Sequence, residues 1–320
     1  MRLRRHVQHL PVLLIVDSKE IMMGKRFDQM LFPGGKTKAL TLSYDDAVVQ
    51  DRRLVALMNQ YGVKGTFNVG SRVLGFQGEG KDFEGRSFDI SKIPPEEVKR
   101  LYEGQEVGGH GLYHSSLPHV GTPLAMREII EDKVLLEDLT GAILTMFAYP
   151  FGAYDDNVRT LLRLAGYHGA RTVKSTHGFA IPEDFLVWDP TCHHDDPNLM
   201  KLIEDFCEGK AFSFGPSLFY LWGHAYEFDQ KDHWDVIERF LKYVQAFKDR
   251  IWFATNGEIM AYVEAFRSLQ YSADGHLIRN PSALTVWLGV PGTLEENGEE
   301  RFKVYTIQPG ETAQIAPTSL

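Results

Sequence analysis

The sequence predicts an α/β barrel, because strand-like apolar runs and amphipathic helical segments alternate between residues 39 and 270. The first unit shows the pattern. Residues 39–42 form an apolar run typical of a buried strand, residues 50–61 carry an apolar helical stripe that ends at Gly62, and residues 64–69 form a second strand-like run. Two strands joined by a helix predict a parallel pair. The number of such units suits a barrel better than a short open sheet.

The later segments continue this alternation and then change character. Residues 70–92 are rich in Gly and charge and lack a hydrophobic period, so we expect a long excursion at the C-terminal end of a strand, where substrate loops usually lie. Residues 271–315 predict a small antiparallel β appendage packed on the barrel. The expected helices cover residues 94–102, 123–139, 155–165, 198–208, 234–247 and 257–269, and the expected strands cover residues 106–110, 144–148, 167–170, 218–222 and 251–254.

These patterns divide the chain into an N-terminal extension (1–35), a barrel (36–270) and a C-terminal β-rich appendage (271–320). The first 16 residues pair a basic start with a short apolar run and so loosely resemble a signal peptide. Pro11 interrupts the run, however, and no small-residue cleavage site follows it. We therefore expect a cytoplasmic protein.

Composition excludes several classes of partner. The formal net charge of -9 argues against a nucleic acid or an anionic membrane surface as the partner. No apolar run is long enough to span a bilayer. The two cysteines, Cys192 and Cys207, form no CxxC motif, so reduced thiols are expected and no disulfide framework is indicated.

Two adjacent carboxylates, Asp45 and Asp46, directly follow the first predicted strand. Two acids at the end of a buried strand are costly unless a cation or a proton-transfer task holds them. Neighbours on an extended chain point in different directions, so one can bind a metal while the other faces a substrate. One of them could instead cap the helix that begins near Gln50. Two acids at one buried strand end favour a functional role.

Histidines lie near two further predicted strand ends. His110 and His114 are four residues apart, and a helical turn would bring them to one face, a spacing that suits a zinc-like ion with a carboxylate as third ligand. His224 follows an aromatic strand. Either feature alone is weak, since a lone histidine is more often structural. Together they are stronger, because barrel active sites are assembled at the C-terminal ends of strands.

The ordered motifs resemble those of NodB-type polysaccharide deacetylases (carbohydrate esterase family four). The resemblance covers about residues 36–270 and implies a distorted (β/α)7 barrel that removes acetyl groups from N-acetylated or O-acetylated carbohydrate with a divalent metal, most often Zn2+, with Co2+, Ni2+, Fe2+ or Mn2+ as alternatives. The Asp-Asp and His-x-x-x-His motifs in this order are specific, and the later two are looser. The matching segments are Ser43-Tyr44-Asp45-Asp46-Ala47, His110-x-x-x-His114, Tyr149-Pro150-Phe151-Gly152 and Leu221-Trp222-Gly223-His224.

The resemblance also implies a role for each matching residue. Asp46, His110 and His114 would be the metal ligands, and Asp45 would be the general base for a water that the metal acidifies. The backbone N–H of Phe151 would stabilise the oxyanion, and His224 would protonate the leaving amine. The residues expected to contact the substrate are Tyr149, Pro150, Phe151, Trp188 and Trp222.

The chain departs from the family pattern at two points. The family has an arginine before the proline of the third motif, which pairs with the catalytic aspartate, whereas this chain has Ala148 there. Arg171, at the end of the next predicted strand, is the nearest replacement, and an arginine beside Asp45 would keep that carboxylate ionised. The fourth family motif is recognisable only as Trp188-Asp189, so Asp189 is carried over as the residue that orients the catalytic histidine.

Structural interpretations remain open for several of these residues. The segment 150–155 could be only a turn and helix cap, and tryptophans are more often core residues than substrate platforms. The run Cys192-His193-His194-Asp195-Asp196 suggests a second metal site, but consecutive residues do not all point at one ion and no spaced partner motif is evident. We prefer a loop near the mouth of the active site. Glu227 is either a partner of His224 or an acid at a helix start.

Three functions are therefore compatible with the sequence. The first is a metal-dependent hydrolase that deacetylates carbohydrate. The second is the same scaffold acting on a C–N bond of a small amide that is not a sugar, suggested by Ala148 and the altered fourth motif. The third is a catalytically silent barrel that binds glycan through aromatic side chains.

Overall fold

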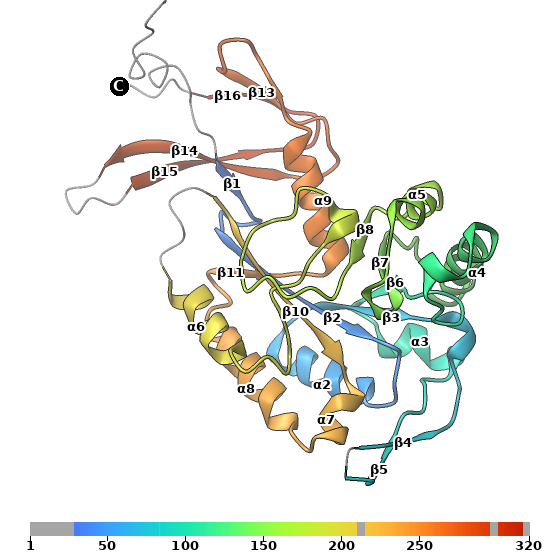
Figure 1. Cartoon of the computed structure of the whole chain (residues 1–320). Helices are drawn as coiled ribbons and strands as arrows, with labels where there is room; N and C mark the ends of the chain where they lie inside the picture. The colour runs from blue at the N-terminus through green and yellow to red at the C-terminus, as the bar shows by residue number, and fades with distance from the viewer. Residues whose placement is uncertain (1–28, 83, 210–214, 295–299, 316–320) are drawn as a thin grey trace, which may run out of the picture.

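The structure is a computed structural model that describes residues 29–82, 84–209, 215–294 and 300–315. A parallel sheet curls into a half-barrel at its centre (Figure 1), with strand order β8-β7-β6-β3-β2-β10-β9 and with β11 also paired to β2. The α/β class and the distorted (β/α)7 barrel are confirmed. The strands are β2 (Lys38–Asp45), β3 (Gly65–Val69), β6 (Glu106–Gly109), β7 (Met146–Ala148), β8 (Gly169–Arg171), β9 (Cys192–His193), β10 (Ser217–His224) and β11 (Ile251–Phe253).

Strand β2 is the axis of this sheet. β10 pairs with it along its whole length, from Lys38 beside Ser217 to Asp45 beside His224. Two strands share its other edge, because β11 pairs with the first part of β2 and β3 pairs with the second part. All of these pairings are parallel, so the C-terminal ends of β2, β3 and β10 lie at the same end of the sheet.

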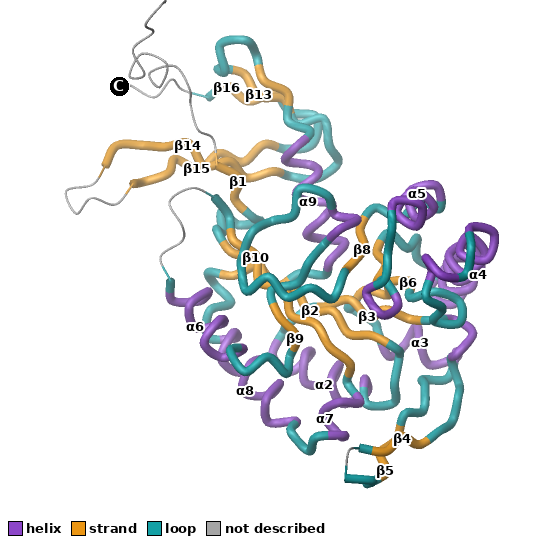
Figure 2. The backbone as a smooth tube through the Cα atoms, in the orientation of Figure 1, coloured by secondary structure: helices purple, strands orange, loops and turns teal. Residues whose placement is uncertain are grey.

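Helices cover the outer face of the sheet, as the tube in Figure 2 shows. The apolar stripe of α2 is buried at Leu54, Val55, Leu57 and Met58, and the helix ends at Gly62 with a φ of 66°, a left-handed angle that glycine adopts without strain. The helices are α2 (Asp51–Tyr61), α3 (Pro95–Leu101), α4 (Thr122–Thr140), α5 (Asp156–Leu164), α6 (Leu199–Glu208), α7 (Tyr226–Gln230), α8 (Trp234–Gln245) and α9 (Asn256–Arg267).

The inner face of the sheet is partly polar and is closed by the start of α9. Thr255 and Glu258 cap this helix reciprocally. The Asn256 side chain then accepts a hydrogen bond from Thr41 Oγ1 at 2.8 Å and donates one to the Tyr220 hydroxyl at 2.6 Å. These buried polar groups are therefore paired inside the half-barrel, as burial requires.

Residues 70–92 leave the C-terminal end of β3, as expected, but they are not structureless. They include a short antiparallel hairpin of β4 (Glu79–Lys81) and β5 (Ser87–Asp89). Phe88 of this hairpin stacks on Tyr226 of α7, with ring centroids 5.9 Å apart. The hairpin consequently stands beside the end of β10, at the bottom of Figure 1.

The C-terminal region forms two small antiparallel sheets, as predicted. One contains β14 (Val286–Leu294) and β15 (Glu300–Ile307), and β1 (Gln29–Leu31) joins it by pairing with β14. The other contains β12 (Gln270–Tyr271), β13 (Leu277–Arg279) and β16 (Thr312–Gln314). Their apolar residues pack with Ala265 and Leu269 at the end of the barrel.

Part of the predicted organisation lies outside the described residues. The signal-like segment and most of the 1–35 extension fall before residue 29, and the turn at residues 295–299 is likewise outside them, so the boundaries 1–35, 36–270 and 271–320 stay a prediction. No helix in the described ranges has the length and apolar character needed to cross a membrane.

Candidate active site and metal centre

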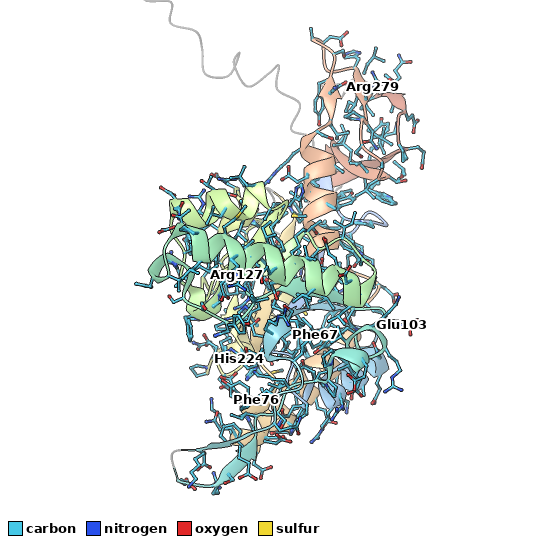
Figure 3. All side chains as sticks on the ribbon, turned by 90° about the vertical axis from the view of Figure 1, so that its right-hand side faces the viewer. Phe67, Phe76, Glu103, Arg127, His224 and Arg279 are labelled. Carbon is cyan, nitrogen blue, oxygen red and sulfur yellow. The ribbon has the colours of Figure 1, made fainter. Side chains whose placement is uncertain are left out.

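The polar residues predicted to be functional gather at the C-terminal end of the sheet. Asp45, Arg171 and His224 close β2, β8 and β10, and His110 follows β6 directly. Figure 3 labels His224 at this end, above the β4–β5 hairpin. Parallel strands bring these residues together although they are far apart in the sequence.

Asp45 is a buried carboxylate with a cationic partner. One oxygen, Oδ1, accepts a hydrogen bond from Asn68 Nδ2 at 2.8 Å, and the other, Oδ2, contacts Arg171 Nη2. Arg171 is fully buried and lies over the Trp222 ring, 4.3 Å from its centroid. Burial alone would raise the pKa of Asp45, but Arg171, and next His110, outweigh it and hold the pKa below its ordinary value. The carboxylate is therefore ionised and able to accept a proton.

Asp46 faces a different set of partners from its neighbour. Its Oδ1 lies 4.0 Å from His110 Nε2 and 3.9 Å from His114 Nε2, and its Oδ2 lies 3.4 Å from Lys92 Nζ. Burial opposes ionisation, but Lys92 and His110 outweigh it and lower the pKa of Asp46 to about 2. Asp46 is consequently an anion that faces two imidazoles.

These three residues fit a divalent metal. One ligand atom from each of Asp46, His110 and His114 lies within 4.8 Å of the others. His110 Nδ1 lies 2.8 Å from the carbonyl oxygen of Ala148, which fixes the proton on Nδ1 and leaves the Nε2 lone pair facing Asp46. Burial lowers the pKa of His110 to about 4, so its ring is neutral, as a metal ligand must be.

The helical turn expected at residues 110–114 is wrong, because these residues form a loop. Two acids of α4 hold it: Asp132 Oδ2 accepts the backbone N–H of His110 at 3.2 Å, and Glu128 Oε2 accepts that of Tyr113 at 2.9 Å. His114 then takes a left-handed φ of 59°, which turns its ring toward Asp46. The histidines converge through loop geometry rather than helical spacing.

Backbone strain marks the same place. Left-handed φ angles are uncommon for residues other than glycine and tend to persist where the surroundings enforce them, often at functional sites. In the described ranges, six such residues occur, and four of them belong to the segments that form this site. These four are Asp46, Ala47, His114 and Phe151, and the other two are His177 and Asp232.

Glu227, rather than Asp189, is the carboxylate beside His224. Glu227 Oε2 accepts the backbone N–H of His224 at 3.1 Å and lies 3.3 Å from its Nδ1. Burial alone would lower the pKa of His224, but Glu227, and then Asp45, raise it above the ordinary value. Asp189 accepts a hydrogen bond from Thr172 Oγ1 instead. The orienting role expected for Asp189 therefore has no geometric support, and Glu227 occupies that position.

The residues expected to contact substrate separate into two groups. Phe151 is 68% exposed and its ring packs on that of His114, with centroids 4.5 Å apart. Trp222 is half-buried beside His224, with ring centroids 5.7 Å apart. Tyr149 is buried and donates its hydroxyl to the carbonyl of Leu186. The rings of Phe151 and Trp222 therefore border the site, whereas that of Tyr149 is a core side chain.

Three alternatives left open by the sequence also have an answer. Trp188 is 1% exposed and packs on Phe185 and Tyr220, so its ring belongs to the core rather than to a substrate surface. Pro150 is buried, and Asp155 at the end of the same segment caps α5, so the turn-and-cap interpretation holds without excluding a role for Phe151. Neither Asp45 nor Asp46 caps α2, because Gln50 occupies the N-cap.

Two functional candidates were missed from the sequence. Lys92 reaches Asp46 from the segment after β5, and Tyr226 places its ring 5.3 Å from that of His224. Lys92 carried no sequence signal, because its segment has no periodicity. Tyr226 could have been found from its position two residues after His224 at the start of a helix.

Comparison with known proteins agrees with this geometry. Residues 33–170 match the family model described as polysaccharide deacetylase. None of the curated proteins compared with the chain matches it. The matched residues include Asp45, Asp46, His110 and His114, and they end just before Arg171.

Solved structures share the fold. A proposed polysaccharide deacetylase from Mycobacterium smegmatis is similar at 17% identity, with a TM-score of 0.54 over 75% of this chain and 94% of that one. The peptidoglycan deacetylase PdaC from Bacillus subtilis matches at 19% identity over 72% of this chain and 93% of that one, with a TM-score of 0.46. BA3943 from Bacillus anthracis, a pseudoenzyme of carbohydrate esterase family four, matches at 15% identity over 70% and 66%, with a TM-score of 0.43. Residues 33–170 of the chain therefore match a polysaccharide deacetylase domain, and the half-barrel fold agrees with that match.

Proposed function

We propose that the chain is a metal-dependent deacetylase that removes acetyl groups from N-acetylated or O-acetylated carbohydrate. One observation carries the proposal: the adjacent carboxylates face different partners. Asp45 contacts Arg171, whereas Asp46 faces His110 and His114. This division matches what the chemistry needs, namely one carboxylate to take a proton and another to hold a cation.

In this proposal Asp46, His110 and His114 hold the ion, of which Zn2+ is the first candidate and Co2+, Ni2+, Fe2+ and Mn2+ are alternatives. When bound, such an ion polarises the acetyl carbonyl and acidifies water. Asp45 accepts the proton of the attacking water through Oδ2. Arg171 keeps Asp45 ionised between turnovers and fixes its orientation.

The leaving group needs a proton and the oxyanion needs a donor. His224 Nε2 lies 3.9 Å from Asp45 Oδ2, so it reaches the same reacting centre from the neighbouring strand, β10. We assign it as the acid that protonates the departing amine or hydroxyl, with Glu227 orienting its ring through Nδ1. We assign the backbone N–H of Phe151 as the donor to the oxyanion, since its exposed turn adjoins His114.

Acetate release from a substrate panel tests this function. The panel contains N-acetylglucosamine oligomers, acetylated xylan and small acetylated amides. Release from either carbohydrate supports the proposal. Release from the amides alone would assign the scaffold to C–N bonds outside sugars. Binding of the oligomers without release from any substrate, by protein whose Asp46, His110 and His114 hold an ion, would indicate a silent glycan-binding barrel.

A further inference from the structure

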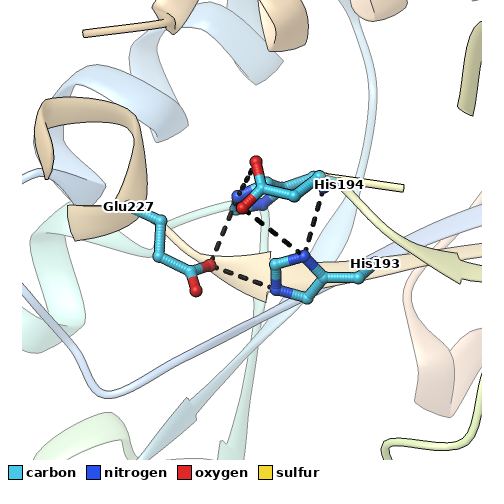
Figure 4. A group of neighbouring side chains, drawn as sticks. His193, His194 and Glu227 are labelled. Carbon is cyan, nitrogen blue, oxygen red and sulfur yellow. Dashed lines mark hydrogen bonds and ion pairs between the residues drawn. The ribbon is translucent and has the colours of Figure 1, made fainter. Parts of the chain in front are cut away.

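A second cluster of side chains that can bind a metal lies where β9 ends. His224 stands between this cluster and the one formed by Asp46, His110 and His114. Figure 4 shows His193 and His194 converging with Glu227 of α7, and Asp195 is the fourth member of the group. One ligand atom from each lies within 4.8 Å of the others. We name these four residues the Glu227 cluster. The spaced partner that the sequence did not reveal is therefore Glu227, which is brought in by the fold.

His194 is the unusual member of the Glu227 cluster. Its ring stacks on those of Tyr44 and Phe228, with centroids 5.7 and 4.3 Å away, and it is 1% exposed. Neither ring nitrogen makes a hydrogen bond to the part of the chain that the structure describes. A buried imidazole without hydrogen bonds is costly, so a ligand at Nε2 would remove a substantial penalty.

The atoms that face His194 Nε2 are carboxylate oxygens at metal-like spacing. Glu227 Oε2 lies 3.3 Å away and Asp195 Oδ1 lies 3.5 Å away. Ligands bound tetrahedrally at about 2.0 to 2.1 Å from an ion lie roughly 3.3 to 3.4 Å from one another. The two distances from His194 Nε2 therefore match those of a tetrahedral site, and the three ligand atoms lie within 4.8 Å of one another.

His193 has a different part in the cluster. Its Nδ1 accepts the backbone N–H of Asp195 at 3.1 Å, so in the neutral ring the proton is on Nε2, which lies 3.1 Å from Glu227 Oε2. This contact orients the Glu227 carboxylate, as outer partners of metal ligands do. Lys231 and His233 contact Asp195 and compete with an ion for that carboxylate.

We propose that His194, Asp195 and Glu227 bind a second divalent transition-metal ion, with His193 orienting Glu227. One imidazole and two carboxylates suit an ion of the Zn2+ or Mn2+ class. The ion fixes Glu227, which contacts His224, so it rigidifies the residue assigned as the acid. Binding itself does not depend on the deacetylase activity, and it can be measured in protein that has lost that activity.

Zinc stoichiometry tests the second site. The full chain is stripped with a chelator, dialysed against Zn2+ and analysed for metal and protein. We expect about two ions per chain in the wild type and about one in His114→Ala, which loses a ligand of the Asp46 cluster (Asp46, His110 and His114). About one is also expected in His194→Phe, whose ring fills the stack, and none in the double variant. His193→Ala should weaken the second site roughly 10- to 100-fold without abolishing it.

Two further variants make the result decisive. Asp195→Asn keeps the shape of the aspartate side chain but removes its charge, and we expect it to lose the second ion as well. This variant provides the test if His194→Phe does not fold. His177→Ala is the matched control, because this exposed histidine pairs with Asp196 in the neighbouring loop, and it must keep both ions. Loss of all zinc from His114→Ala would overturn the proposal, and so would unchanged stoichiometry in folded His194→Phe or Asp195→Asn. Zinc retained by His114→Ala but lost from His194→Phe would support it even if the Asp46 cluster proved empty.

Discussion

The two histidine and carboxylate clusters flank His224 but are built differently. The Asp46 cluster (Asp46, His110, His114) combines two strand ends and a loop, and its backbone is strained at Asp46 and His114. The Glu227 cluster uses the end of β9, the loop that follows it and one short helix, and its signal is the ring of His194, which makes no hydrogen bond within the described residues. Asp46 Oδ1 lies 3.9 to 4.0 Å from the two histidine nitrogens in the first, and His194 Nε2 lies 3.3 to 3.5 Å from the two carboxylate oxygens in the second.

The comparison shows that backbone strain and a buried polar side chain without hydrogen bonds are separate indicators of a candidate site. The Asp46 cluster also carries Lys92, a cation that pairs with Asp46, and it adjoins Asp45, which Arg171 holds. The Glu227 cluster touches the reaction only through His224. Variants in the first cluster should therefore change chemistry directly, and variants in the second should change it through His224.

Among the residues that surround the two carboxylates, the largest effect is expected for Arg171→Met. Removing the guanidinium leaves buried Asp45 without its cation, so the pKa of Asp45 rises and the acid limb of the rate profile moves to higher pH. We expect kcat near neutral pH to fall by about 100-fold or more, and stability to fall by roughly 3 to 5 kcal/mol. Rate profiles and denaturant melts measure both. Arg171→Lys keeps the positive charge and should retain part of the activity and part of the stability. An unchanged acid limb in Arg171→Met would show that Arg171 does not act on Asp45.

A smaller effect is expected for Glu227→Gln. Glu227 raises the pKa of His224, so its removal lowers that pKa and moves the alkaline limb of kcat/KM to lower pH. The rate at the optimum should fall by roughly tenfold. Asp189→Asn is the control, since Asp189 contacts Thr172, and its alkaline limb should not move. A shift in Asp189→Asn without one in Glu227→Gln would return the orienting role to Asp189.

The smallest effect is expected for Lys92→Met. Lys92 Nζ lies 3.4 Å from Asp46 Oδ2 and repels any cation bound there. Its removal should raise Zn2+ affinity at the Asp46 cluster by about fivefold, which corresponds to roughly 1 kcal/mol. Competition with a fluorescent chelator measures this affinity. Lys174 is an exposed cation near Asp189, away from this cluster. Lys174→Met should therefore leave the Zn2+ affinity unchanged. Weaker zinc binding in Lys92→Met would instead mean that Lys92 organises the site.

The fold was predictable because its signals are local. Hydrophobic periodicity located most strands and helices of the barrel within a few residues, and Gly62 ended α2 where expected, but β9 and the β4–β5 hairpin were not predicted. Arg171 was predicted to lie near Asp45 because parallel strands end at the same edge of a sheet. The structure places the two side chains in contact.

The rest depended on tertiary contacts that no local pattern encodes. The loop at His110 and His114 is shaped by Glu128 and Asp132 of α4, so the helical turn inferred from spacing was wrong. Glu227 reaches His193 and His194 only because β10 lies beside β9. Tyr149 and Trp188 were expected to contact substrate but are core residues, because an aromatic ring can serve either in a core or as a sugar platform and the sequence does not show which.

The central claim is that neighbouring carboxylates divide proton transfer from metal binding, and one paired measurement tests it. Zinc content and acetate release are compared in Asp45→Asn and Asp46→Asn, each in the His194→Phe background so that only the Asp46 cluster is counted. We expect Asp45→Asn to keep about one zinc per chain while turnover falls by roughly 1,000-fold or more, and Asp46→Asn to lose both zinc and turnover. Loss of zinc from Asp45→Asn, or zinc-bound Asp45→Asn that still turns over at the rate of its parent, would contradict the division.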